Sequence, residues 1–389
     1  MSEQYSFETK LLHNKHKFDP ATGAVSVPIQ HASTFHQQEI DSFGKYDYAR
    51  SQNPTREALE EIIADLEDGF KGFAFASGMA AISSAFLLLS QGDHVLISED
   101  VYGGTYRMVT TVLNRFGIEH TFVDMTDLAA VKAAVKPNTK VFYIETPSNP
   151  LMKVTDIKAV SELAKQNDAW TFVDNTFLTP ALQRPLSIGA DIVLHSATKF
   201  LSGHSDVIAG LAVVKDEELA KQLGYIQNSF GAVLGVQDCW LLMRGLKTLH
   251  VRMKHSSEAA AEIATYLNSH PAIKKVYYPG FSDHPQYDIQ QEQATSPGAV
   301  FSFELHSEEA MRTFVKNVEL PVFAVSLGAV ESILSYPAKM SHAAMDPIAR
   351  QERGISDALL RLSVGLENPQ DLIADFEAAL KKTAELHYI

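Results

Sequence analysis

Between about residues 70 and 215, the chain alternates short apolar runs with segments of helical periodicity. The runs are GFAFA, DHVLIS, HTFVD, KVFYIE, WTFVD, DIVLHS and GLAVVK. Nearly continuous apolar runs of this length are typical of strands buried on both faces, and intervening helices are typical of parallel connections. The pattern therefore predicts an α/β fold in which helices cover both faces of a mostly parallel sheet.

The segments on either side of this region have different patterns. The stretches DPATGAVSVPIQHASTF and YDYARSQNPT are extended and turn-rich, and a helix is expected to begin near Thr55. After about residue 245, a long helical stretch ends before Pro271 and is followed by strand-like GAVFSFEL, PVFAVSL and LLRLSVG. We expect an N-terminal arm over residues 1–60, a large domain over 61–245 and a smaller α+β domain over 246–389.

Composition narrows the class of protein. The 389 residues are 46% hydrophobic and carry a net charge of −14, which repels the phosphate backbone of nucleic acids. The N-terminus lacks an apolar signal core and no run is long enough for a membrane helix, so a cytoplasmic location without membrane contact is expected. The single cysteine, Cys239, excludes an intrachain disulfide framework and is expected to be a buried, inert thiol. Small-molecule chemistry is the expectation.

Polar residues follow four of the predicted strands where those strands end. They are Ser77 with Gly78, Glu145, Asp174 and Lys199. Parallel sheets bind ligands at the carboxyl ends of their strands, so these side chains are expected to share one pocket.

Ser77 and Gly78 precede an apolar helix and could either bind a phosphate or serve as an ordinary helix cap. The dinucleotide fingerprint and the P-loop are both missing, so a nucleotide is not the expected ligand. Ser196 and Thr198 alternate with Ala197 and Lys199 and could present two hydroxyls and an amine to one pocket, although solvated polar residues at a strand end would look the same.

Asp174 and Arg361 are both expected to be buried, and each requires a partner. Asp174 could pair with a protonated ring nitrogen or with an arginine. Arg361, between leucines in LLRLSVG, could bind a substrate carboxylate or form a structural ion pair. A phosphate cradle, an amine, a buried carboxylate and an arginine together match the requirements of pyridoxal 5′-phosphate.

A metal-dependent hydrolase is a rival interpretation because the chain has 15 histidines, and His195 and His204 flank the lysine. Their spacing fits no helical ligand pair, so both are expected to be structural and no metal site is expected.

Eight ordered motifs resemble the pyridoxal-phosphate-dependent enzymes of Cys/Met metabolism, the trans-sulfuration family. They are YDYARSQNPT, ASGMAA, EDVYGGTYR, ETPSNP, VDNTF, SATKFLSGHSD, SLGAVES and LRLSVGLE, and they span nearly the whole chain. The resemblance is greatest to cystathionine β-lyases of the Bacillus type. It implies the type I pyridoxal-phosphate-dependent transferase fold, which is aspartate aminotransferase-like, with a smaller α+β C-terminal domain.

The resemblance also implies a role for each matching residue. Lys199 would bind the cofactor as a covalent Schiff base and move the Cα proton, Asp174 would keep the pyridine nitrogen protonated, and Tyr102 would stack on the ring. The cofactor phosphate would be bound by Ser77, Gly78, Met79, Ser196 and Thr198, and from the neighbouring subunit by Tyr48 and Arg50. The substrate carboxylate would be held by Asn149, Ser326 and Arg361, with Glu145 close to the cofactor.

The implied reaction is β-cleavage of L-cystathionine to homocysteine, pyruvate and ammonia in methionine biosynthesis. Gly103 and Gly104 stand where methionine γ-lyases carry a cysteine, and Val325 stands where many γ-enzymes carry an acidic residue. Cystathionine γ-lyase, γ-synthase or methionine γ-lyase activity stays open as an alternative, as does a cofactor-binding protein without catalysis. The resemblance implies a homotetramer built as a dimer of dimers that share their active sites.

Overall fold

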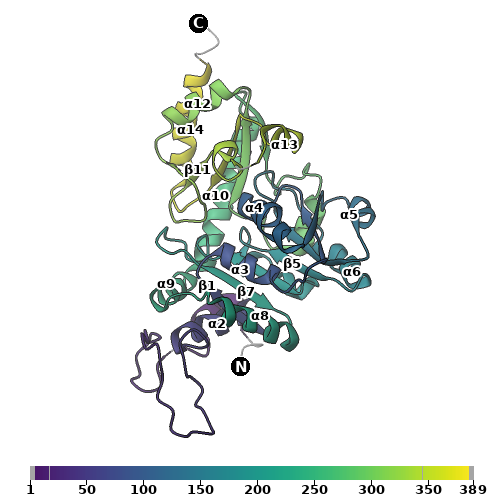
Figure 1. The fold of residues 1–389 in the computed structure, drawn as a ribbon. Coiled ribbons are helices and arrows are strands. Elements are labelled where there is room, and N and C mark those ends of the chain that lie inside the picture. The colour runs from purple at the N-terminus through teal and green to yellow at the C-terminus, as the bar shows by residue number, and fades with distance from the viewer. Residues whose placement is uncertain (1–4, 17, 344, 385–389) are drawn as a thin grey trace.

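A seven-stranded sheet forms the centre of the larger part of the molecule (Figure 1). The structure is a computed structural model that describes residues 5–16, 18–343 and 345–384. The strand order is β1-β7-β6-β5-β4-β2-β3. The strands are β1 Lys71–Phe75, β2 His94–Ser98, β3 Glu119–Val123, β4 Thr139–Glu145, β5 Trp170–Asp174, β6 Ile192–Ser196 and β7 Gly210–Val214. Strands β2 to β6 are parallel and β7 is antiparallel to both of its neighbours, so the predicted mostly parallel sheet is confirmed.

Alternation along each strand divides the apolar side chains between two faces of this sheet. In β4, Val141 and Tyr143 join the core under α3 and α8, whereas Phe142 and Ile144 join the core under α5 and α6. Helices therefore cover both faces, as expected for parallel strands. The helices of this part are α2 Pro54–Leu66, α3 Gly78–Phe86, α4 Gly103–Arg107, α5 Leu128–Ala134, α6 Ile157–Gln166, α7 Thr179–Leu182, α8 Glu217–Phe230 and α9 Val236–Leu246.

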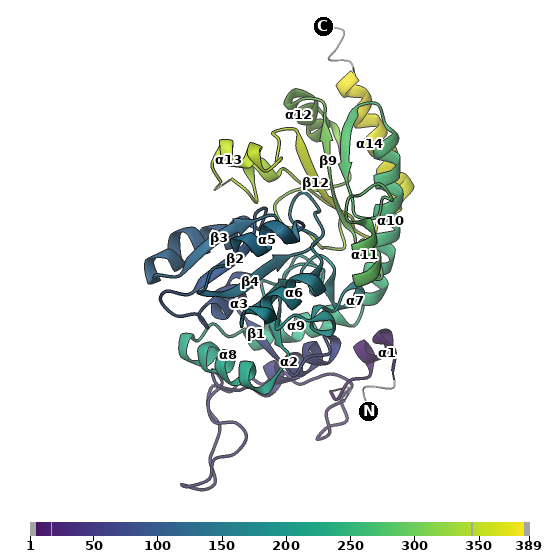
Figure 2. The ribbon, with the colours of Figure 1, turned by 90° about the vertical axis from the view of Figure 1, so that its right-hand side faces the viewer.

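A second sheet has five strands in the order β10-β11-β12-β9-β8. Figure 2 shows α10 and α14 lying side by side along it. Its strands are β8 Ile273–Tyr277, β9 Val300–Leu305, β10 Val322–Phe323, β11 Ile333–Ser335 and β12 Leu359–Ser363, and its helices are α10 Leu249–Ser269, α11 Tyr287–Gln293, α12 Glu308–Asn317, α13 Pro347–Glu352 and α14 Pro369–Ala384.

Helix α10 connects the two parts of the molecule. Its first turns add Leu249 and Met253 to the core below the large sheet, and its later turns add Ile263 and Leu267 to the core of the smaller sheet. The division of the chain at residues 60/61 and 245/246 stays a prediction, because one helix contributes to both cores.

The N-terminal arm contains the short helix α1 Phe7–Leu12 and then loops that extend away from the body below α2 (Figure 1). Its attachment begins at α2, whose N-cap is Asn53. The Asn53 side chain accepts the backbone N–H groups of Thr55 and Arg56, and Pro54 occupies the first turn. The predicted start near Thr55 is therefore confirmed, with Asn53 as the capping residue.

One strand prediction is wrong over most of its length. Of PVFAVSL, only Val322–Phe323 is a strand, because Ser326 lies in the left-handed region with φ +85°. A serine there is strained, and such strain is typical of functional positions. Cys239 is buried as expected, and burial raises the pKa of its thiol. Among the described residues, no helix is long and apolar enough to span a membrane.

Candidate active site

A cavity of about 580 Å³ opens where the carboxyl ends of the parallel strands meet the smaller sheet. It brings together all but two of the predicted site residues: Ser77, Gly78, Met79, Tyr102, Glu145, Asn149, Asp174, Ser196, Thr198, Lys199, Ser326 and Arg361. A larger hollow, of about 1380 Å³, lies beside the N-terminal arm and is lined by none of them. We refer to the first as the active-site cavity.

The N-terminus of α3 forms one end of the active-site cavity. Ser77 caps the helix, and its Oγ accepts the backbone N–H of Ala80 at 3.0 Å. A Cβ at Gly78 would lie 2.9 Å from the Cβ of Ser196, so glycine is required for this helix end to approach β6 so closely. A helix N-terminus presents backbone N–H groups and a positive dipole end, and here a serine hydroxyl lies beside them. These groups suit a phosphate.

Asp174, the last residue of β5, is a buried carboxylate with hydrogen bonds but no ion pair. Its Oδ1 accepts the backbone N–H and the hydroxyl of Thr176, at 3.0 and 2.5 Å, and its Oδ2 accepts the Tyr143 hydroxyl at 3.5 Å. No lysine or arginine of the described chain lies within ion-pair distance of it. The structure therefore does not support the alternative in which Asp174 pairs with an arginine.

Glu145 lies next to Asp174, because β4 and β5 pair in register at these two residues. Its Oε2 accepts the backbone N–H of Tyr102 at 2.9 Å, which ties the start of α4 to the sheet. Burial, and next the charge of Asp174, raise the pKa of Glu145 well above its usual range. Burial also raises the pKa of Asp174, but the hydrogen bonds from Thr176 oppose this. When the pair shares one negative charge, these effects favour placing it on Asp174 rather than on Glu145.

Lys199 follows β6 and points its amine toward the smaller sheet. Its Nζ donates a hydrogen bond to the Oγ of Ser326 at 2.6 Å. The contact depends on Gly328, which has φ +77° and whose Cβ, if present, would lie 2.5 Å from the backbone nitrogen of Phe200. Burial, and next the positive charge of Arg361, lower the pKa of Lys199 to about 8. A substantial fraction of the amine is therefore neutral near physiological pH.

Arg361 of β12 reaches the same cavity from the smaller sheet and is 3% exposed. Its Nη1 donates to the Oδ1 of Asn149 at 2.8 Å, and its Nη2 donates to the Ser326 carbonyl at 2.7 Å. Its Nε is buried and has no hydrogen-bond partner among the described residues. Burial lowers the pKa of Arg361 to about 10, so the guanidinium is charged at neutral pH. A charged fork with a free donor suits a carboxylate.

Tyr48 and Arg50 are the two predicted site residues that the structure does not place in the active-site cavity. The Arg50 guanidinium lies 5.4 Å from the centre of the Tyr48 ring, and its Nη1 donates to the carbonyl of Asn228 at 3.1 Å. The Tyr48 side chain is 46% exposed. Within one chain, these residues form a separate exposed cluster on the arm.

Several lining residues were not predicted from the sequence. Thr176 bonds to Asp174 and also accepts the backbone N–H of Ser196, so it joins β5 to β6. Ser335 pairs in register with Arg361 and accepts its Nη2 at 3.3 Å. The position of Thr176, two residues after a strand-end aspartate, is a readable signal. Ser335 gives no signal, because its role depends on strand pairing across the chain.

These residues fit pyridoxal phosphate, the expected cofactor. Asp174 is a buried carboxylate that a protonated ring nitrogen would balance, the end of α3 would hold the phosphate, and Lys199 offers an amine in the same cavity. The Thr198 hydroxyl also lines the cavity while bonding to the backbone of Ala209. Each part of the cofactor has a complementary group in the cavity.

Known proteins similar to this chain are also pyridoxal-phosphate-dependent enzymes. The family model described as Cys/Met metabolism PLP-dependent enzyme, where PLP is pyridoxal phosphate, matches residues 8–381. A cystathionine beta-lyase of Bacillus subtilis is 68% identical over 380 residues, covering 98% of this chain and 97% of that protein. A cystathionine gamma-lyase of the same organism is 50% identical over 374 residues, covering 96% and 99%.

A solved structure is similar over the whole fold. The crystal structure of a cystathionine gamma-lyase from Lactobacillus plantarum, complexed with L-serine, has a TM-score of 0.96 and 49% identity, covering 98% of this chain and 100% of that chain. The predicted fold and the predicted cofactor are thereby confirmed. The chain belongs to the Cys/Met metabolism family of pyridoxal-phosphate-dependent enzymes.

Proposed function

We propose that this protein is a carbon–sulfur lyase that cleaves L-cystathionine by β-elimination. The observation that carries the proposal is the meeting of the Lys199 amine, the Asp174 carboxylate and the Arg361 guanidinium in one cavity. The identity of 68% to a beta-lyase, against 50% to a gamma-lyase of the same organism, favours β-cleavage. The products are homocysteine, pyruvate and ammonia, and homocysteine connects the reaction to methionine biosynthesis.

The cavity lining supports the proposed cofactor contacts. The phosphate would be held by Ser77, Gly78, Met79, Ser196 and Thr198, Tyr102 would stack on the ring, and Lys199 would form the covalent link; all of these residues line the cavity. When bound, pyridoxal phosphate supplies an aldehyde that captures an amine and a ring that accepts electron density from Cα. The rest of the chemistry belongs to side chains of this chain.

Lys199 is proposed to take the proton from Cα of the substrate. Its pKa of about 8 leaves enough neutral amine at neutral pH, and the hydrogen bond to Ser326 fixes where Nζ lies. The electron pair of the Cα–H bond forms a Cα–Cβ double bond as the Cβ–S bond breaks. The pair of the broken bond leaves with sulfur, which takes up a proton to give homocysteine, and water releases pyruvate and ammonia from the remainder.

Asp174 and Arg361 orient and stabilise the reacting groups. The Asp174 charge, favoured by the hydrogen bonds from Thr176, would hold a proton at the ring nitrogen. The free Nε of Arg361 binds the substrate carboxylate beside the Asn149 amide. Binding at a fixed carboxylate places the Cα–H bond near the Lys199 amine, which is the effect of orientation on rate.

The apolar character of Val325 supports β-cleavage. Val325 lines the active-site cavity and is 65% exposed, so no carboxylate from this position meets the distal amino group of cystathionine. γ-Cleavage needs a second proton abstraction, at Cβ, and begins with the same residues. It is therefore the second candidate, and the products distinguish the two.

The test is to incubate the cofactor-loaded protein with L-cystathionine and to measure pyruvate and free thiol. Equal amounts of pyruvate and homocysteine support the proposal. A yellow protein that retains its cofactor but releases neither product from cystathionine or cysteine would instead be a binding protein without catalysis. Unchanged turnover after exhaustive chelation is also expected, because the proposed steps use no metal.

We also propose a homotetramer made of two dimers that share active sites. Tyr48 and Arg50 lie outside their own chain's cavity, and the arm before them exposes Ile40 at 92% and Phe43 at 68%. Exposed apolar side chains of this kind are typical of a surface that another chain covers. Light scattering of the purified holoprotein tests the assembly: a mass of four chains supports it and a stable monomer contradicts it. A cytoplasmic location stays a prediction from the sequence.

A further inference from the structure

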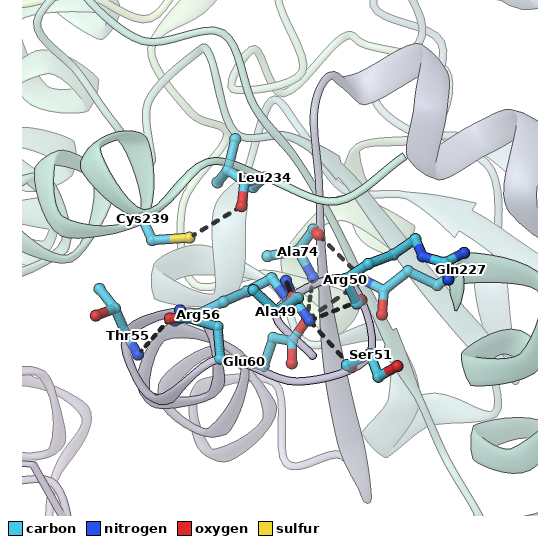
Figure 3. Close-up of polar contacts among 11 residues, drawn as sticks. Ala49, Arg50, Ser51, Thr55, Arg56, Glu60, Ala74, Gln227, Leu234 and Cys239 are labelled. Atoms are coloured by element: carbon cyan, nitrogen blue, oxygen red, sulfur yellow. Dashed lines mark hydrogen bonds and ion pairs between the residues drawn. The ribbon is translucent and has the colours of Figure 1, made fainter. Parts of the chain in front are cut away.

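Arg56, in the first turn of α2, is a buried arginine that binds the backbone of the arm. It is 2% exposed. Its Nη1 donates to the carbonyl of Ala49 at 2.7 Å, and its Nη2 donates to the carbonyls of Arg50 and Ser51 at 3.1 and 3.0 Å (Figure 3). One guanidinium therefore fixes three successive peptide groups of the segment that carries Tyr48 and Arg50.

Glu60 holds this guanidinium from the next turn of α2. Its Oε1 lies 3.5 Å from the Nε of Arg56. The same oxygen accepts the backbone N–H of Ala74 in β1 at 2.9 Å and the amide of Gln227 at 3.3 Å (Figure 3). The charge of Arg56 opposes the rise in the pKa of Glu60 that burial causes. The pair is thus fixed to the central sheet through β1.

Neither Arg56 nor Glu60 lines the active-site cavity. An arginine buried so completely has a desolvation cost, which is offset here by carbonyl oxygens and one carboxylate. The chain before Ala49 is largely exposed, whereas the chain from Asn53 onward is buried against the body. Arg56 therefore binds the arm where it leaves the body, at Arg50 and the residue on either side of it.

We propose that Arg56, held by Glu60, is a positioning residue for the active site of a second copy of this chain. By fixing the peptide groups of residues 49–51, it sets the direction in which Tyr48 and Arg50 extend toward the cofactor phosphate of that copy. The inference rests on the shared active site proposed above. Its consequence is specific: loss of Arg56 impairs the partner's site and leaves the chain's own Lys199 usable.

Arg56→Met removes all three carbonyl contacts and keeps a side chain of similar length. The homo-oligomer is expected to bind pyridoxal phosphate at least tenfold more weakly, measured by the visible absorbance of the protein during cofactor titration. Arg56→Lys keeps the charge but has a single nitrogen, and a smaller loss is expected. Cofactor affinity equal to that of the wild type in Arg56→Met would overturn the inference.

A mixed oligomer decides whether the effect acts within a chain or between chains. Arg56→Met chains and Lys199→Ala chains, each with a different tag, are coexpressed and the hybrids are purified through both tags. In each hybrid dimer, one site combines Lys199 of the first chain with the intact arm of the second. That site is expected to regain covalent cofactor, detected by borohydride reduction and peptide mass spectrometry, and to regain turnover. Hybrids that bind no more covalent cofactor than Arg56→Met alone would refute the inference.

Two controls make the result specific. A hybrid of Arg50→Ala and Lys199→Ala chains tests the shared site itself. If this hybrid does not regain covalent cofactor, the proposed sharing of active sites fails. If it does, but the Arg56→Met hybrid does not, only the role of Arg56 fails.

Arg252 is a second buried arginine and donates to the carbonyls of Phe200 and Gly245 in its own chain. Any cofactor loss in Arg252→Met is expected to remain in the hybrid, and equal rescue of it would overturn the assignment.

If Arg56→Met chains do not assemble, the same hybrid is made with Arg56→Lys. The weaker cofactor binding expected of that variant must then be corrected by the Lys199→Ala partner. Uncorrected binding in an assembled Arg56→Lys hybrid counts against the inference in the same way.

Discussion

Replacing Arg361 with methionine tests the proposed recognition of the substrate. The substitution removes a guanidinium that is 3% exposed and that holds its position through Asn149 and the Ser326 carbonyl. Burial lowers its pKa to about 10, yet it remains charged at neutral pH, so the variant loses a full positive charge at the point where a carboxylate would bind. Lys199 and Asp174 are left in place.

The expected magnitude follows from the donor that is lost. The free Nε of Arg361 can make a charge-assisted hydrogen bond to the substrate, and such a bond contributes about 1.5–3 kcal/mol. Its loss corresponds to a fall in kcat/KM of about 10- to 10²-fold. Arg361→Lys keeps the charge without the fork and is expected to lose less.

The assay is kcat/KM for L-cystathionine in protein whose cofactor content is first shown to equal that of the wild type. Arg350 provides a matched control, because it is a buried arginine that pairs with Asp357 outside the active-site cavity. Arg350→Met is expected to lower the melting temperature without a comparable change in kcat/KM. A loss smaller than about threefold in fully loaded Arg361→Met would refute the role of Arg361, since it corresponds to under about 1 kcal/mol.

Three further predictions follow from the same geometry. Lys199→Ala is expected to abolish turnover while the fold still binds pyridoxal phosphate noncovalently, as dialysis and visible absorbance would show; near-normal turnover contradicts the assignment. In cofactor-free protein, the rate of pyridoxal phosphate uptake is expected to rise with pH, with a midpoint near 8, the pKa of Lys199. Arg361→Met should move that midpoint upward, because a positive charge next to Lys199 is lost. A midpoint that stays the same or falls would contradict the effect of Arg361 on the pKa of Lys199. Burial lowers the pKa of His342 to about 4, against about 6.5 in the unfolded chain, so the unfolded chain binds the extra proton and the free energy of unfolding falls by up to about 3 kcal/mol as pH drops from about 6.5 to 4. Denaturant titrations should show that the free energy of unfolding depends less steeply on pH in His342→Gln than in the wild type. Equal slopes would show that His342 does not cause this pH dependence.

The large sheet was predictable because its strands are buried on both faces. Such strands are nearly continuous apolar runs, and all seven runs are strands in the structure. Strand β8 was missed because its exposed Lys274 and Lys275 interrupt the apolar pattern, and β11 was missed because it has only three residues. Apolar content therefore identified the longer buried strands and missed an edge strand with exposed lysines and a very short buried strand in the smaller sheet.

At the strand predicted around Ser326, contacts within the active site override the local sequence pattern. PVFAVSL has the composition of a strand, but Ser326 has φ +85° and uses its hydroxyl for Lys199 and its carbonyl for Arg361. Those two contacts come from distant parts of the chain, and no local preference encodes them. The strained backbone of Ser326 marks a functional position that the strand-like composition does not reveal.

The site itself was predicted from residue types at strand ends together with the family resemblance. Ser77, Asp174 and Lys199 could be placed together because the carboxyl ends of parallel strands share an edge. The pairing of Arg361 with Asn149 could not be derived from pattern, because 212 residues separate them and Asn149 lies in the loop after β4, whereas Arg361 is in β12 of the smaller sheet. Ser335 was missed for the related reason that its contact with Arg361 depends on the register between strands. Thr176 was missed although its contact with Asp174 is local and could have been read from the sequence.

The central claim is that the Cβ–S bond of cystathionine is the bond that breaks. The most direct measurement is the full product analysis of L-cystathionine treated with the holoprotein, with both possible pairs of products quantified in one reaction. If the Cβ–S bond breaks, pyruvate and homocysteine are formed in equimolar amounts as the dominant pair. Dominant 2-oxobutyrate with cysteine would show γ-cleavage and would contradict the claim.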